Sequence, residues 1–206
     1  MSLFPTTSAH VLRHLNLGEY ITNKVPSLHT FMLKDLGKNT ENEGTIPAMT
    51  ALSSAMRSLQ RCEFKSNHGA WVKTVEPKLG PGIGERVWEA IRTTEEDIIP
   101  QCHAVKSELR SALNELLKDN GVLALPTIPG APPKLLTEAS LLENFRAKAF
   151  SLLSIAGMSG VCQVTVPLGM DENLPMSISL LARHGADLSL LGLVQMLYSN
   201  LRDKQL

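Results

Sequence analysis

Apolar residues recur every three or four positions along most of the chain, which predicts amphipathic helices. The helical spacing covers residues 47 to about 70, 85 to about 120, 138–154, and 187 onward, and a shorter helix is expected at 17–25. Pro47 suits a first helical turn, Pro100 is expected to kink or divide its segment, and Asp187 is expected to cap the last helix. The buried face of that last helix is expected to comprise Leu188, Leu191, Val194, Leu197 and Leu201.

Three short apolar runs, at residues 122–125, 161–166 and 176–182, predict strands. The first run lacks polar residues, which is typical of a strand buried on both faces. Gly- and Pro-containing segments separate the runs: an irregular turn at 127–133, a small flexible segment at 156–160, and a turn at 167–175 that joins the last two strands as a hairpin or a short crossover. We therefore predict a helix-rich α/β fold with about three to five strands, whose strand-bearing core is 121–187.

Composition narrows the possible functions. The 206 residues are 43% hydrophobic and 19% charged, which is typical of a globular domain. Lys plus Arg and Asp plus Glu both number 20, so a broad basic surface for nucleic acid or anionic membranes is not expected. The three cysteines are expected to be reduced thiols. Neither a membrane span nor a signal peptide is expected, and these features predict a cytoplasmic location, with the nucleoplasm as an alternative.

Pairs of titratable residues give weak signals. His10 and His14 have the spacing of a metal-binding pair, but no third ligand accompanies them, so structural histidines are the favoured interpretation. Glu63 and His68 are five residues apart, which does not bring side chains together on a helix, so an acid–base pair is disfavoured. Three glycines between residues 80 and 84 follow no strand and lack the rest of a phosphate-loop motif, so they are expected to form a connector. No metal and no cofactor is predicted.

Three further residues lie near the expected strands. Ser159 is in Gly-Met-Ser-Gly, which differs from the strand–Ser–helix elbow of serine hydrolases because the serine precedes a strand. Cys162 is inside a predicted strand, so a structural thiol is favoured over a nucleophile. His184 follows a strand, where ligands often bind, but a role in a surface turn is favoured. The residues alone therefore indicate no self-sufficient catalytic centre.

The order of motifs from residue 121 onward resembles the C-terminal part of the amidase signature family. Residues 123–127 match its strand and Pro-Thr turn, 164–169 match its strand ending in Pro-x-Gly, and 174–181 match its Leu-Pro strand, before Gly185 and Asp187. Upstream, residues 51–71 and 82–93 are most similar to plant members of the indole-3-acetamide hydrolase type. The related outer-envelope import receptors share this region and continue into tetratricopeptide repeats.

This resemblance implies that residues 1–206 are a single partial domain, the C-terminal half of a large mixed sheet wrapped by helices. The family hydrolyses carboxamides with a serine nucleophile, a bridging serine and a lysine base. Those serines belong to a Gly/Ser-rich signature in the N-terminal half, and this sequence contains no such run. No catalytic residue is therefore assigned to this chain, and the chain alone is expected to be inactive. The implied substrate of the whole enzyme is a small amide such as indole-3-acetamide.

The family's cleft lies between its catalytic core and C-terminal elements, which makes Thr127, Ile128 and Phe150 the candidate substrate-binding residues. Ordinary packing is the alternative for each of them. An isolated half would expose a sheet edge and apolar helix faces, so a separate N-terminal half or self-association is the expected partner. Two functions stay open at this point: a truncated amidase and a non-catalytic interaction module.

Overall fold

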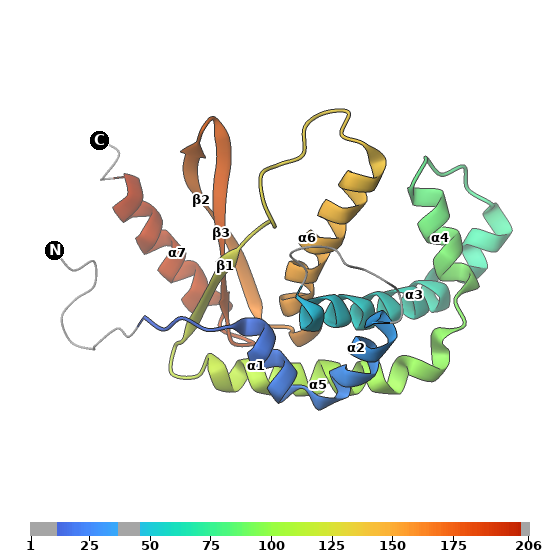
Figure 1. Cartoon of the computed structure of the whole chain (residues 1–206), viewed down its shortest axis with the longest axis horizontal. Helices are drawn as coiled ribbons and strands as arrows, with labels where there is room; N and C mark the ends of the chain where they lie inside the picture. The colour runs from blue at the N-terminus through green and yellow to red at the C-terminus, as the bar shows by residue number, and fades with distance from the viewer. Residues whose placement is uncertain (1–11, 37–45, 203–206) are drawn as a thin grey trace.

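A layer of helices lies beside a three-stranded sheet in the computed structural model, which describes residues 12–36 and 46–202 (Figure 1). The helices are α1 (Leu17–Lys24), α2 (His29–Leu36), α3 (Pro47–Val75), α4 (Ile83–Arg92), α5 (Ile99–Leu116), α6 (Ala139–Ser159) and α7 (Asp187–Arg202), with short 3-10 turns at Pro26–Leu28 and Glu95–Ile98. The strands are β1 (Val122–Pro126), β2 (Cys162–Asp171) and β3 (Leu174–Ala182). The predicted helix-rich α/β class with three strands is confirmed.

Local chemistry explains where the helices begin. The Asn16 side chain accepts a hydrogen bond from the Glu19 N–H and caps α1. Pro47 and Pro100 both stand in the first turn of a helix, where a missing N–H leaves no helical hydrogen bond unmade. The expected helix over 85–120 is consequently divided before Pro100, by the 3-10 turn, into α4 and α5.

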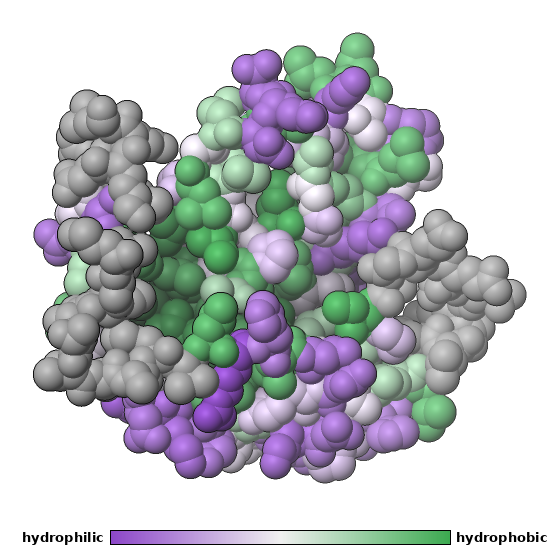
Figure 2. All heavy atoms as spheres, turned by 60° about the vertical axis from the view of Figure 1, so that its left-hand side comes forward, coloured by the Kyte–Doolittle hydropathy of each residue, from purple (hydrophilic) through white to green (hydrophobic). Residues whose placement is uncertain are grey.

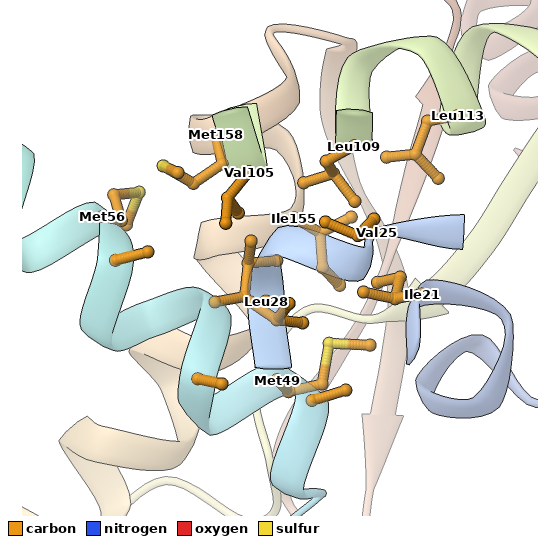
Figure 3. Close-up of a cluster of buried hydrophobic side chains, with 14 of the residues drawn as sticks. Ile21, Val25, Leu28, Met49, Met56, Val105, Leu109, Leu113, Ile155 and Met158 are labelled. Carbon is orange, nitrogen blue, oxygen red and sulfur yellow. The ribbon is translucent and has the colours of Figure 1, made fainter. Parts of the chain in front are cut away.

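The main core forms where α1, α3, α5 and α6 converge (Figure 3). Its buried members include Ile21 and Leu28 near the N-terminus, Met49 and Met56 on α3, Val105, Leu109 and Leu113 on α5, and Ile155 and Met158 on α6. Each fully buried side chain of this size contributes about 1.5–3 kcal/mol through removal of apolar surface from water. The helical layer is therefore the principal source of hydrophobic stabilisation.

The segment 156–160 was predicted to be small and flexible, and that prediction is wrong for most of it. Helix α6 continues to Ser159 and ends at Gly160, whose backbone is left-handed with φ 70°. Continuation of the helix carries Met158 into the core, where it is 1% exposed. The small residues allow α6 to approach α3 closely, since a Cβ on Gly157 would lie 2.7 Å from the Met56 sulfur.

The sheet is antiparallel throughout, with strand order β1-β3-β2. The prediction that the first strand is buried on both faces is wrong: β1 is at the edge of the sheet, only Leu125 is buried, and Val122 is 40% exposed. A short apolar run does not by itself distinguish a central strand from an edge strand that contributes one face to a core.

β2 and β3 form the hairpin that the sequence allowed, with a much tighter turn than expected. β2 continues through Pro167 to Asp171, because an edge strand tolerates a residue without an N–H. A register shift between Pro167 and Gly169 marks an irregularity there. Glu172 and Asn173 make the turn with φ values of 47° and 65°, the left-handed pair that a two-residue hairpin loop requires.

Helix α7 covers one face of the sheet, and the predicted contact face of the helix is correct for Val194 and Leu197 but wrong for Leu188 and Leu191. Leu190 is 3% exposed and packs with Val194 and Leu197 against a cluster of Val166, Leu180 and Ala182. Leu188 and Leu191 are 86% and 56% exposed. The sheet contacts the helix face that contains Leu190, Val194 and Leu197. The spacing of leucines in the sequence was equally compatible with a contact face that begins at Leu188. The side chain of Leu201 is outside the described residues.

The other sheet face joins the helical core at one end only, through Leu123, Leu125 and Leu181. Figure 2, in which the left-hand side of Figure 1 comes forward, shows apolar side chains gathered near the centre of the surface between polar ones. Within the described residues, β1 and β2 each pair on one side only. None of the described helices is long and apolar enough to span a membrane.

Candidate functional site

Three polar side chains surround a buried serine on the sheet face opposite α7, and we call these four residues the Ser179 cluster. Ser179 is 0% exposed, in the middle of β3. Its Oγ lies 3.0 Å from Thr127 Oγ1 and 3.4 Å from Thr165 Oγ1. Gln163 Nε2 donates a hydrogen bond to the same oxygen at 3.1 Å. The cluster connects β2 and β3 to the start of the loop after β1.

The strand register explains why these side chains converge. Ser179 is paired with Leu125 on β1 and with Thr165 on β2, and side chains opposite one another in a sheet share a face. Leu181, two residues further along β3, is on that same face and enters the helical core. The face therefore changes from apolar to polar between Leu181 and Ser179.

The cluster has the chemistry of a binding surface. Hydroxyl and amide groups donate and accept hydrogen bonds, and Gln163 and Thr165 are exposed enough to reach a ligand. Neither hydroxyl nor amide side chains titrate near neutral pH, so these groups position a polar ligand without acting as a general base. The Ser179 cluster is thus a candidate site for holding a substrate, with the reacting groups supplied from elsewhere.

The three predicted substrate-binding residues do not all lie together. Thr127 belongs to the Ser179 cluster, and Ile128 follows it with 36% of its surface exposed. Phe150, on α6, lines a groove between α3, α4 and α6, and Thr127 and Ile128 do not line that groove. Sequence reasoning missed Ser179, although a serine inside the apolar run Ile178-Ser179-Leu180 was a visible signal of a polar position on a buried strand.

Ser159 and Cys162 have structural environments. Ser159 is 1% exposed, and its Oγ donates to the Ile155 carbonyl at 2.6 Å and accepts from the Val161 N–H at 3.3 Å, so it closes the end of α6. Burial, followed by the nearby Asp187, raises the pKa of the Cys162 thiol. A raised pKa keeps the thiol protonated at neutral pH, and the thiolate is the nucleophilic form.

His184 lies in a surface turn, as favoured from the sequence, and connects three elements. Its Nδ1 is 2.7 Å from the Gly160 carbonyl, which only accepts, so Nδ1 carries the proton. Arg110 Nη2 lies 3.0 Å from Nδ1 and 3.1 Å from Nε2, and with the Nδ1 proton directed at the Gly160 carbonyl, Nε2 is the nitrogen that accepts from the guanidinium. The His184 N–H donates to Asn114 Oδ1 at 3.0 Å. These bonds hold the end of β3 against α5 and the end of α6.

The remaining titratable candidates are dispersed. The His68 ring lies 4.8 Å from the Phe64 ring, centroid to centroid, and Glu63 is exposed. His14 is exposed, and His10 is outside the described residues. In residues 12–36 and 46–202, no group of three or more His, Cys, Asp or Glu side chains is arranged to hold a metal ion.

Comparison with known proteins identifies the family. No family model matches the chain. The sequence is, however, 57% identical over 187 residues, 91% of this chain, to Amidase 1 of Arabidopsis thaliana. The chain belongs to the amidase signature family. It is also 51% identical over 197 residues to Amidase 1 of Oryza sativa, and it spans 44% of the length of each of these two relatives.

Structural comparison agrees with this amidase assignment at the level of the fold. A crystal structure described as an amidase superposes with a TM-score of 0.61 over 88% of this chain and 44% of the other chain. Sequence identity in that comparison is 22%, so it shows a shared fold. The motifs from residue 121 onward correctly predicted the family and the position of this amidase-family chain in its C-terminal half.

The predicted cytoplasmic or nucleoplasmic location is contradicted by other relatives. The amidase-family chain is 42% identical over 193 residues to the chloroplastic Outer envelope protein 64 of Arabidopsis thaliana. It is 39% identical over 193 residues to the mitochondrial Outer envelope protein 64 of the same plant. Net charge and the lack of a long apolar run were insufficient grounds for predicting a cytoplasmic location, because proteins of an organelle envelope can have both properties.

Proposed function

We propose that this chain is one part of a single amidase domain and forms one wall of its substrate cleft. The reaction of the complete domain is hydrolysis of a small carboxamide, such as indole-3-acetamide, to the acid and ammonia. The observation that carries this proposal is the 57% identity to Amidase 1 over 91% of the chain. The Ser179 cluster supports it, because Thr127 of the family's Pro-Thr motif belongs to that cluster.

The proposed division of labour follows from the chemistry of the two parts. Amide hydrolysis requires an activated nucleophile and a proton for the leaving nitrogen. The serines and the lysine of the family's centre are supplied by the N-terminal half, whereas this chain supplies Thr127 and Ile128 to the cleft wall and Ser179 to hold Thr127 in place. Phe150 contributes an apolar surface on α6. The 206-residue chain alone does not hydrolyse amides.

A chimera tests this proposal. In it, this chain replaces the matching segment of Arabidopsis Amidase 1, and ammonia release from indole-3-acetamide is measured. We expect an active chimera whose kcat/KM falls by about tenfold or more when Thr127→Val removes one hydrogen bond at the cleft wall. Thr74→Val is the matched control, because Thr74 is exposed at the end of α3 and bonds only within its own helix.

A thermal melt of the chimera is needed beside the activity measurement, because an unfolded chimera would also release no ammonia. A chimera that melts cooperatively and releases no ammonia contradicts the amidase proposal. Equal losses of kcat/KM in Thr127→Val and Thr74→Val contradict the assignment of Thr127 to the cleft wall while leaving the amidase proposal in place.

A non-catalytic interaction module is the second candidate, favoured by the 42% identity to Outer envelope protein 64 over 94% of this chain. In that case the surface that an amidase uses for its catalytic half instead contacts another protein at an organelle envelope. Incubation of the purified chain with isolated chloroplast or mitochondrial outer envelopes, followed by sedimentation, distinguishes the candidates. Co-sedimentation together with a folded but inactive chimera favours the interaction module.

A further inference from the structure

The α3–α4–α6 groove has a volume of about 710 Å³ and is separate from the Ser179 cluster. Helix α3 lines it with Arg57, Arg61 and Phe64, and α6 lines it with Phe150 among other side chains. A volume of this size is typical of small-molecule sites, which are about 300–1,000 Å³.

The groove is lined by aromatic and aliphatic side chains and by charged side chains, of which more are positive than negative. The lining contains four arginines and two glutamates, an excess of two positive charges. Both glutamates already have partners: Glu89 lies 3.0 Å from Arg61, and Glu143 lies 3.8 Å from Arg86 and 3.7 Å from Arg146. The excess charge is therefore not neutralised within the groove.

Of the four arginines that line the groove, Arg57 is the one with no carboxylate partner among the described residues. Its guanidinium carbon lies 4.8 Å from the centroid of the Phe150 ring, so the ring holds the guanidinium by a cation–π contact. This contact leaves the N–H groups at the guanidinium edge available, and such a planar fork matches the two oxygens of a carboxylate. Phe150 thus presents Arg57 and offers an apolar surface beside it.

From this arrangement, we propose that the α3–α4–α6 groove binds organic acids that carry a carboxylate on a flat apolar body. Arg57 pairs with the carboxylate, and the aromatic lining of Phe64 and Phe150 holds the body. A carboxamide of the same shape carries no charge for Arg57, so the groove selects acids over amides. This inference goes beyond the proposed function. Phe150 is the one residue that the two share, and pairing of a carboxylate with Arg57 does not require amide hydrolysis.

Calorimetric titration of the 206-residue chain with 4-phenylbutyrate, and with 4-phenylbutyramide as the neutral match, tests the proposal. We expect the acid to bind about tenfold or more tightly than the amide, because a hydrogen-bonded charge pair is lost with the amide. Arg57→Gln is expected to lower the affinity for the acid to that for the amide. Phe150→Leu is expected to weaken both ligands together.

Arg92→Gln is the matched control. Arg92 also stacks on an aromatic ring, 5.6 Å from the Trp88 centroid, but it does not line the groove, so its loss is expected to leave both affinities unchanged. Equal affinity for acid and amide overturns the proposal, as does an unchanged affinity for the acid in an Arg57→Gln variant with the parent's circular dichroism spectrum. Failure of the acid to bind at about 10 mM overturns it as well.

Discussion

At the scale of single residues, side chains of the same type have opposite environments, and the sequence pattern alone did not separate them. Leu181 is 0% exposed between the sheet and the helical core, whereas Leu188 is 86% exposed at the start of α7. Both were expected to be apolar core positions. Leu181 is buried because its sheet face meets the helical core, whereas Leu188 is exposed because of the register between α7 and the other face, and both depend on contacts between residues far apart in the sequence.

This contrast gives a matched pair of substitutions. Leu181→Ala is expected to lower the free energy of unfolding by about 2–5 kcal/mol, through lost burial and a residual cavity. Leu188→Ala is expected to change it by less than about 0.5 kcal/mol. Urea denaturation followed by circular dichroism measures both, and similar losses in the two variants would show that α7 packs in the register expected from the leucine pattern.

Ser179 is a residue whose polar character was visible in the sequence but whose partners were not. Its identity was visible in the sequence, but its importance depends on Thr127 in the loop after β1 and on Gln163 and Thr165, which are both on β2. A serine in an apolar strand indicates a polar position on a buried face. Which partners it meets is decided by the antiparallel order β1-β3-β2, and the sequence left that order open.

At the scale of elements, the residues that start, end or turn a segment were the most informative part of the sequence. Pro47 began a helix where expected, and the helix expected to end at about residue 120 ends slightly earlier, at Leu116. Boundaries were misplaced where tertiary packing overrides local preference. Helix α6 extends through small residues because Met158 completes the core, and β2 extends through Pro167 because it is an edge strand.

Two glycines in helices test the role of backbone conformation. Gly160 ends α6 with φ 70°, and an added Cβ would lie 3.2 Å from Arg110 Nη2. Gly160→Ala is therefore expected to lower the free energy of unfolding by about 1 kcal/mol or more. Gly192 is inside α7, where an added Cβ meets nothing within 4 Å. Gly192→Ala is expected to raise that free energy by about 0.5–1 kcal/mol.

Thermal melts and urea titrations compare these variants. The opposite signs are the informative result, since a general intolerance of substitution would destabilise both proteins. A stabilised Gly160→Ala protein would contradict the left-handed termination of α6.

At the scale of the whole molecule, the structure resembles part of a larger fold. The helical layer has a well-buried core, whereas the sheet has three strands, two open edges within the described residues, and one face only partly joined to that core. The family was predictable because its C-terminal motifs are short turns and strand ends with distinctive Pro and Gly positions. The location was not predictable from composition, and the fold brings together only two of the three candidate substrate-binding residues, Thr127 and Ile128.

Reconstitution of activity from two separately produced chains tests the central claim most directly. The 206-residue chain is mixed or co-expressed with the segment of Arabidopsis Amidase 1 that it does not match, and ammonia release from indole-3-acetamide is followed. The account predicts no release from either chain alone and release from the complex of the two. Release of ammonia by the 206-residue chain alone, abolished by substitution of one of its own serines, would contradict it.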